Sequence, residues 1–208
     1  MKFMLFVEGY TEQKAIPTFL KRWLDKRLTF KVGIQSVRFD GWAEMVKDLP
    51  QKASLYLNDR FSQDVIAVIG LLDAYGPTFY PNNKKTVMER VVWAKKELES
   101  RVNNKRFRMF FAVHEVEAWL LSDPSIFPPI INSSLPDKVQ YPEMINFNKP
   151  PAQLLDKIYK ERTGHSYKKI TQGNILFNHL DPDMAYNKCP FFKELLDEMY
   201  QLAKQSGL

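Results

Sequence analysis

The chain has 208 residues, of which 45% are hydrophobic and 26% are charged, the ordinary composition of a folded domain. This composition excludes extended disorder, the single cysteine excludes an internal disulfide framework, and no apolar run is long enough to cross a bilayer, so we expect a cytoplasmic protein. The net charge of +6 is uneven, because residues 84–108 alone hold nine basic and three acidic residues. Such basic segments attract polyanions, nucleic acid first among them, unless they only solvate helix faces.

The first half of the chain alternates short apolar runs with amphipathic segments. Four runs have the character of strands, in order residues 2–7, 32–39, 65–72 and 107–113. Four segments have the character of helices, in order residues 11–24, 42–57, 86–102 and 118–121. We expect Thr11 to cap the first helix and Pro50 to interrupt the second. The alternation predicts an α/β fold with a small parallel sheet of about four strands flanked by helices.

The second half of the chain has a different character. Prolines recur over residues 124–151 with little periodicity, which predicts a long excursion, and a series of helices follows to residue 208. We therefore predict an α/β core over residues 1–123 and, over residues 124–208, an excursion with a C-terminal helical extension packed on that core.

Acidic residues follow three of the predicted strands. Glu8 ends the first strand, Asp73 the third, and Glu115 and Glu117 the fourth, while Glu12 lies one helical turn beyond Glu8. Ligands of open α/β sheets bind at the carboxyl ends of the strands, so these carboxylates are expected to meet at one edge. Such a cluster needs a neutralising charge, and a hard cation such as Mg²⁺ or Mn²⁺ suits an all-oxygen site. The alternative is that each acid only balances a nearby helix N-terminus.

These residues also carry a resemblance to a known fold. Val7-Glu8-Gly9-Tyr10-Thr11-Glu12 resembles the first motif of the Toprim domain, the catalytic fold of topoisomerases, primases and small ribosomal-RNA maturases. The form of this motif is most similar to that of the overcoming-lysogenization-defect (OLD) nucleases. That resemblance implies a Toprim-like fold in which both Glu8 and Glu12 contact metal.

A narrower resemblance covers nearly the whole chain. It is to a bacterial Toprim-like family described as a domain of unknown function, on Val7-Glu8-Gly9-x-Thr11-Glu12, Asp73-x-Tyr75-Gly76, His114-Glu115-x-Glu117-Ala118-Trp119-Leu120, Tyr167-Lys168-Lys169 and Cys189-Pro190-x-Phe192. Members of this family accompany ATPases of the ABC or AAA type, in settings that suggest defence against phage. The resemblance therefore implies a partner ATPase and a role in phage defence.

One position departs from the Toprim pattern. The family's Asp-x-Asp corresponds here to Asp73-Ala74-Tyr75, so that Tyr75 stands in place of the second Asp. Three interpretations are open. Glu115 or Glu117 replaces the missing ligand, the site holds one metal rather than two, or the site binds without cutting.

Basic residues complete the predicted site. Related nucleases use a lysine from outside the sheet to stabilise transition-state charge, and the resemblance assigns that catalytic role, beside Glu8 and Asp73, to Lys168 or Lys169. The basic segment supplies the residues expected to hold the phosphate backbone of DNA or RNA, namely Lys84, Lys85, Arg90, Lys95, Arg106 and Arg108.

The sequence thus favours a Toprim-type, Mg²⁺- or Mn²⁺-dependent nuclease that acts with a partner ATPase. Its predicted metal ligands are Glu8, Glu12, Asp73, Glu115 and Glu117. Two alternatives remain open. One is a non-catalytic adapter or sensor module that docks on an ATPase, and the other is a phosphotransfer enzyme that processes nucleotides with the same carboxylates.

Overall fold

A four-stranded parallel sheet forms the centre of the molecule. The computed structural model describes residues 1–58, 60–136, 140–143 and 150–208. The strands are β1 (Lys2–Val7), β2 (Gly33–Arg38), β3 (Val65–Asp73) and β4 (Phe107–Ala112), and their order in the sheet is β2-β1-β3-β4. All three pairings are parallel, so the predicted α/β fold class is confirmed and the carboxyl ends of the strands share one edge.

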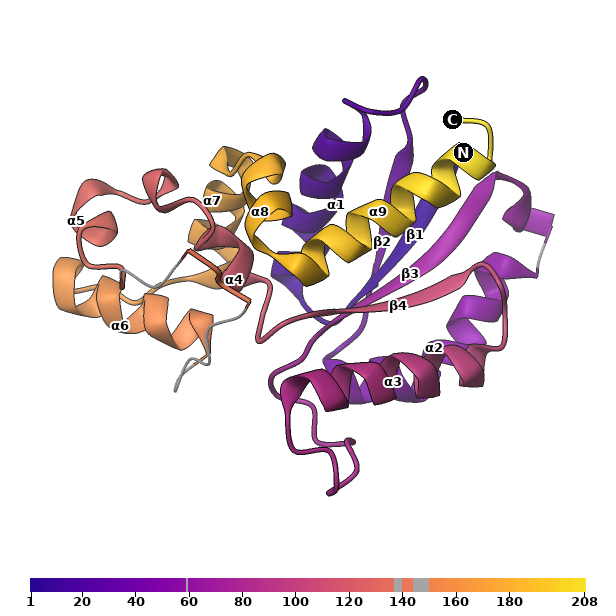
Figure 1. The fold of residues 1–208 in the computed structure, drawn as a ribbon, viewed down its shortest axis with the longest axis horizontal. Helices are drawn as coiled ribbons and strands as arrows, with labels where there is room; N and C mark the ends of the chain where they lie inside the picture. The colour runs from indigo at the N-terminus through magenta and orange to yellow at the C-terminus, as the bar shows by residue number, and fades with distance from the viewer. Residues whose placement is uncertain (59, 137–139, 144–149) are drawn as a thin grey trace.

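Helices cover both faces of this sheet (Figure 1). Helices α1 (Tyr10–Leu24) and α9 (Pro190–Gln205) pack on one face, and α2 (Trp42–Leu57) and α3 (Val87–Val102) on the other. Side chains alternate along β1, so that Phe3 joins the core beneath α1 and α9 while Phe6 joins the core beneath α2 and α3. β3 is buried along its whole length, as expected of a central strand covered on both faces.

Two local predictions are wrong. Helix α1 begins at Tyr10, with Gly9 and not Thr11 at the N-cap position and no side-chain cap, which places Glu12 third in the helix. Helix α2 runs through Pro50 without interruption. The missing Pro50 N–H would leave the Val46 carbonyl without its helical donor, and the guanidinium of Arg101 on α3 donates to that carbonyl at 2.8 Å instead.

The second half of the chain adds short helices beside the sheet. They are α4 (Glu117–Leu120), α5 (Pro129–Asn132), α6 (Pro151–Thr163), a π-helical turn (Lys169–Gly173), α7 (Asn174–His179) and α8 (Pro182–Lys188), with a 3₁₀ turn at Pro124–Ile126. Another 3₁₀ turn, Arg60–Asp64, directly precedes β3. Trp119 of α4 and Phe192 of α9 stack in the same core as Phe19 of α1. Part of the predicted excursion, residues 137–139 and 144–149, lies outside the described residues. Among the described helices, none combines the length and apolarity that a membrane crossing needs.

Candidate metal centre

The predicted carboxylates meet at the carboxyl edge of the sheet. Glu8, Glu12, Asp73 and Glu115 line one cavity of about 490 Å³, together with Lys169. Glu117 is fully buried, and one of its oxygens lies within 4.8 Å of oxygens of Asp73 and Glu115. Three strand ends and the first turn of α1 therefore deliver five carboxylates to one place, as the strand order predicts.

Backbone donors hold two of these acids in place. Oε1 of Glu8 accepts a hydrogen bond from the Asp73 N–H at 3.0 Å, which ties the end of β1 to the end of β3. Oδ1 of Asp73 accepts from the Val116 N–H at 3.0 Å, which ties β3 to the turn after β4. In that turn His114 has a φ of 68°, a left-handed conformation that is uncommon for a residue other than glycine. Such conformations gather at functional sites, and this one precedes Glu115.

Glu12 enters the cavity because the residue before its helix has no side chain. A Cβ added to Gly9 would lie 2.3 Å from Oε2 of Glu12, so the Glu12 carboxylate occupies the space that any other residue would fill. The side chain turns back over the N-terminus of α1, where the helix dipole favours a negative charge.

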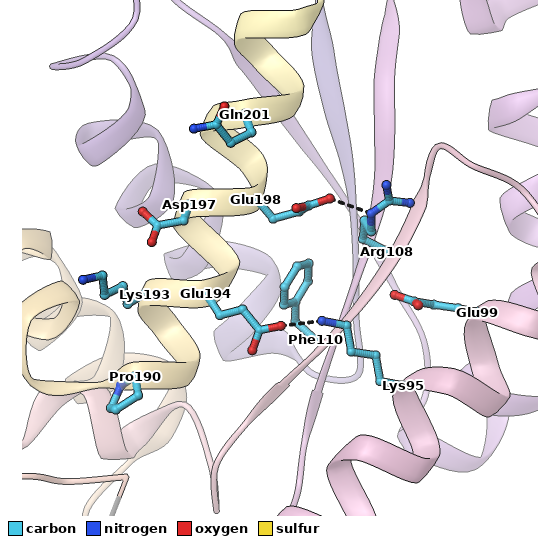
Figure 2. A pocket seen from close by; sticks show the side chains of 10 residues that line it. All are labelled: Lys95, Glu99, Arg108, Phe110, Pro190, Lys193, Glu194, Asp197, Glu198 and Gln201. Atoms are coloured by element: carbon cyan, nitrogen blue, oxygen red, sulfur yellow. Dashed lines mark hydrogen bonds and ion pairs between the residues drawn. The ribbon is translucent and has the colours of Figure 1, made fainter.

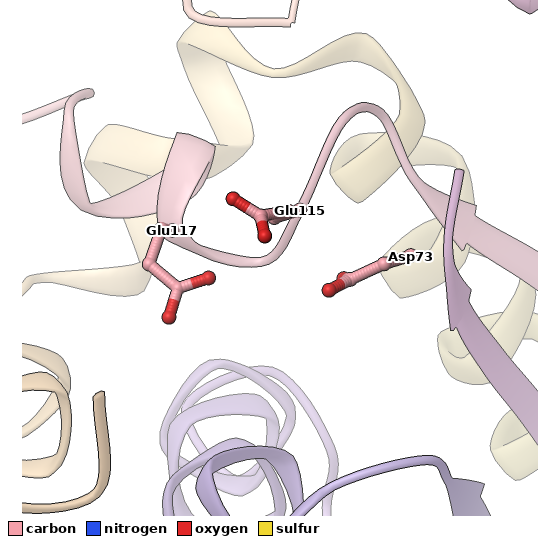
Figure 3. Close-up of side chains that lie close together, drawn as sticks. All are labelled: Asp73, Glu115 and Glu117. Carbon is pink, nitrogen blue, oxygen red and sulfur yellow. The ribbon is translucent and has the colours of Figure 1, made fainter. Parts of the chain in front are cut away.

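Asp73, Glu115 and Glu117 form the tightest group in the site. One oxygen of each lies within 4.8 Å of an oxygen of the other two. Figure 3 shows the three side chains converging from the end of β3, the turn after β4 and the start of α4. Oε1 of Glu117 has no hydrogen-bond partner among the described residues, although its atom is buried. A buried, unpartnered carboxylate oxygen is costly, so this group needs either a proton or a nearby positive charge.

Lys169 supplies part of that charge. Its Nζ lies 3.1 Å from Oε1 of Glu115 and 3.2 Å from Oε2 of Glu117. The neighbouring Lys168 is exposed and is not among the residues that line the cavity. Of the two lysines between which the sequence left the choice open, Lys169 is therefore the one placed at the carboxylates.

The electrostatics of the cluster reflect its burial. Desolvation raises the pKa of Glu8 to about 7, against the opposing hydrogen bond from Asp73. Desolvation raises the pKa of Glu117 to about 7 as well, although the charge of Lys169 opposes it. The pKa of Asp73 lies well above its ordinary value because of burial and the charges of Glu12 and Glu8. Burial lowers the pKa of Lys169, but the surrounding carboxylates outweigh it and hold the ammonium charged.

The residues present fit a divalent cation. Glu8, Glu12, Asp73 and Glu115 share the cavity with the Lys169 ammonium, and all the candidate ligand atoms are hard oxygens. Oε1 of Glu117 is buried and has no donor among the residues that the structure describes. Mg²⁺ and Mn²⁺ prefer such oxygen ligands. The carboxylates Asp73, Glu115 and Glu117 are the best-placed ligands because of their mutual distances, and Glu8 and Glu12 lie on the same cavity.

The predicted nucleic-acid contacts divide into two groups. Lys84, Lys85 and Arg90 lie around the start of α3, in and just beyond the loop that follows Asp73, and Arg90 lies 5.5 Å from the ring centroid of Tyr80. Arg106 precedes β4 at the opposite end of the sheet and donates to the backbone carbonyls of Leu57, Ser62 and Val65. The structure therefore does not bring Arg106 to the carboxylates.

Lys95 and Arg108 line a different cavity, of about 510 Å³, between α3, β4 and α9 (Figure 2). Lys95 pairs there with Glu194, and Nε of Arg108 donates to Glu198 at 2.6 Å. These cations are neutralised within the chain, and Glu99 and Asp197 add further negative charge. This cavity has no excess of positive charge to hold a phosphate backbone.

Two aromatic residues at the cavity were not predicted as site residues. Tyr10 and Trp42 line it beside the carboxylates, and each follows the end of a strand, β1 and β2 respectively. The rule that located the acids would also have located these two rings. The hydrogen bond from the Ala152 N–H at the start of α6 to Oε2 of Glu115, at 2.9 Å, has no comparable sequence signal.

The comparisons with known proteins place the chain in a family. No curated protein matches it. The solved structures that are similar over nearly their whole lengths include the C-terminal region of the Burkholderia pseudomallei OLD protein (15% identity, TM-score 0.48, 96% of each chain). They also include the C-terminal region of the Xanthomonas campestris pv. campestris OLD protein (15% identity, TM-score 0.46, 99% of this chain and 98% of that chain). The model of the family described as "Domain of unknown function (DUF4276)" matches residues 7–200, and the chain belongs to that family.

Proposed function

We propose that this protein is a divalent-metal-dependent nuclease that hydrolyses phosphodiester bonds at the carboxylate edge of its sheet. The observation that carries the proposal is the convergence of five carboxylates near the Lys169 ammonium, one of them with a buried oxygen that lacks a hydrogen-bond partner among the described residues. A hard divalent cation would neutralise these carboxylates. In a protein with a net positive charge, a metal bound there would support the hydrolysis of phosphodiester bonds.

Each residue has a distinct role in this proposal. Asp73, Glu115 and Glu117 would hold Mg²⁺ or Mn²⁺, with Glu8 and Glu12 completing the oxygen set. When bound, the metal supplies a Lewis acid that polarises the phosphodiester and lowers the pKa of the attacking water. Lys169 keeps a fixed positive charge beside the reacting phosphate, and the resemblance to related nucleases gives it the stabilisation of transition-state charge.

A nuclease assay with matched variants tests this function. Purified protein is incubated with DNA and RNA substrates in Mg²⁺, in Mn²⁺ and in EDTA. Glu8→Gln and Asp73→Asn should each lower the rate at least about a hundredfold, since even outer-shell partners of metal ligands cost 10–100-fold. Glu161→Gln, which changes an exposed carboxylate on α6, is the control. Metal-independent cleavage, or full activity in both site variants, would refute the proposal.

One observation favours a second candidate, the non-catalytic adapter. Lys169 already neutralises part of the cluster through its ion pairs with Glu115 and Glu117. In an adapter the metal would be structural or absent, so either no Mn²⁺ binding at these carboxylates or Mn²⁺ binding without metal-dependent cleavage favours the adapter. The nuclease would bind Mn²⁺ in a calorimetric titration and lose both Mn²⁺ binding and cleavage in Asp73→Asn.

The family resemblance extends the proposal to a partner ATPase of the ABC or AAA type and to phage defence. Co-purification of the protein with an ATPase of this type from its native cells tests that part separately. Loss of phage protection in a strain that carries Asp73→Asn would link the carboxylates to the defence role.

A further inference from the structure

Three aromatic side chains surround the carboxylates. Tyr10, Trp42 and Tyr75 line the same cavity as Glu8, Glu12 and Asp73. Tyr10 is 51% exposed and Tyr75 is 52% exposed, so about half of each residue is accessible to a ligand. Exposed aromatic side chains that gather around one polar cavity indicate a binding surface rather than core packing.

The neighbouring aromatics have a different role. Phe79 stacks on Tyr80 at 4.7 Å between ring centroids, and also lies 5.9 Å from Trp93 and 5.9 Å from Trp42. The Tyr80 hydroxyl donates to the Ala74 carbonyl at 3.3 Å. This cluster fixes the loop after β3 and supports one face of Trp42.

Two of the rings at the cavity pack against neighbouring side chains. The guanidinium of Arg38 lies 4.1 Å from the ring centroid of Tyr10, and the Trp42 ring stacks on Phe79 at 5.9 Å between centroids. The backbone of Tyr75 is held by the hydrogen bond from its N–H to the His114 carbonyl at 2.9 Å, which fixes the point from which its ring projects. Groups restrained before binding lose less conformational freedom when a flat ligand stacks on them.

We propose that the site takes an unpaired nucleotide of a single-stranded nucleic acid, with its base stacked on Tyr75, Tyr10 or Trp42 while its phosphate lies at the carboxylates. This inference rests on the proposed function. A cavity of about 490 Å³ is within the range of small-ligand sites, which suits one nucleotide. In a duplex the bases are stacked within the helix and cannot reach these rings, whereas an unpaired base exposes its π-face to them.

The test compares one sequence as a single strand and as a duplex. Binding is measured in Mg²⁺ by fluorescence anisotropy with nuclease-resistant phosphorothioate strands, and hydrolysis is measured with ordinary strands. We expect the single strand to bind and react at least about tenfold better. Tyr75→Leu should lower single-strand affinity about tenfold, or ~1.4 kcal/mol, whereas Tyr75→Phe should retain it because stacking requires the ring and not the hydroxyl. Tyr141→Leu, at an exposed tyrosine that does not line the cavity, is the control.

The outcomes separate this inference from the proposed function. Equal binding and hydrolysis of duplex and single strand, unchanged in Tyr75→Leu, would overturn the inference and leave the nuclease intact. Tyr75-dependent binding of single strands without hydrolysis would support the inference and refute the nuclease. Binding or hydrolysis of free nucleotides alone would overturn both.

Discussion

Gly9 determines where a candidate metal ligand lies. Its backbone is extended, with a φ of −141°, so the position does not require glycine for conformational reasons. What it requires is space, because the Glu12 carboxylate occupies the position of the missing side chain. Gly9 therefore acts on the site and has little to do with the fold.

Because Gly9 affects the site and not the fold, we expect Gly9→Ala to change metal affinity but not stability. The added methyl group meets only the end of a flexible side chain, so the free energy of unfolding should change by less than about 0.5 kcal/mol in EDTA. Affinity for Mn²⁺ should fall about tenfold, because the Glu12 carboxylate is displaced. Chemical denaturation and calorimetric titration measure the two effects. Glu12→Gln should reproduce the loss of affinity, and unchanged Mn²⁺ binding in both variants would remove Glu12 from the ligand set.

At the scale of elements, two helices carry internal prolines whose missing hydrogen bonds are replaced from outside. Pro50 of α2 has no N–H to donate to the Val46 carbonyl, and Arg101 donates to that carbonyl instead. Pro17 of α1 likewise has no N–H to donate to the Gln13 carbonyl, which accepts a hydrogen bond from the hydroxyl of Ser36 on β2 at 3.1 Å instead. In both helices a neighbouring element supplies the donor, and the helix continues past its proline.

A double-mutant cycle tests this compensation. Arg101→Met should destabilise the protein by about 1 kcal/mol, because the Val46 carbonyl loses its donor. In a Pro50→Ala background the backbone N–H restored at position 50 can bond the Val46 carbonyl within the helix, so Arg101→Met should cost at least about 0.5 kcal/mol less there. Urea denaturation measures all four proteins. An equal cost in both backgrounds would show that Arg101 does not compensate for Pro50.

These elements also show what the sequence can and cannot reveal. The strands and the acids at their ends were predictable because apolar runs and their termini are local features. The continuity of α2 was not, since its donor Arg101 lies on another helix. Nor could the sequence show whether Lys168 or Lys169 lies at the carboxylates, because that depends on how the π-helical turn orients the two side chains. Arg106 was predictable in principle: a residue that precedes a parallel strand lies at the edge opposite to the acids.

At the scale of the whole molecule, the buried acids make stability depend on pH. Glu8 and Glu117 have pKa values of about 7 in the fold against an ordinary value of 4.5. An acid whose pKa is raised by folding contributes stability below its unfolded pKa and loses that contribution as pH rises through its folded pKa. The metal-free protein should therefore lose stability between about pH 4.5 and pH 7, and a cation that neutralises these carboxylates should reverse the loss.

Thermal unfolding at pH 5 and pH 8 checks this prediction. In EDTA the Tm should be lower at pH 8, and Mn²⁺ should raise the Tm at pH 8 much more than at pH 5, where protons compete for the same oxygens. Glu143 provides a matched control, because burial also raises its pKa to about 7 while it accepts hydrogen bonds from Trp119, Phe191 and Phe192 away from the site. Glu143→Gln should reduce the pH dependence in EDTA and leave the effect of Mn²⁺ unchanged. An equal Mn²⁺ effect at both pH values would contradict the assignment.

The two contacts of Glu115 have a consequence for the protein during its synthesis. All five acids have left the ribosome once residue 117 has emerged, but the Ala152 N–H and the Lys169 ammonium follow much later. Until then the acids repel one another without the Lys169 ammonium that pairs with Glu115 and Glu117 in the folded chain. Under the proposed function, a nascent chain is therefore expected to leave nucleic acid uncut, including the messenger from which it is translated, until its C-terminal helices have closed over the sheet.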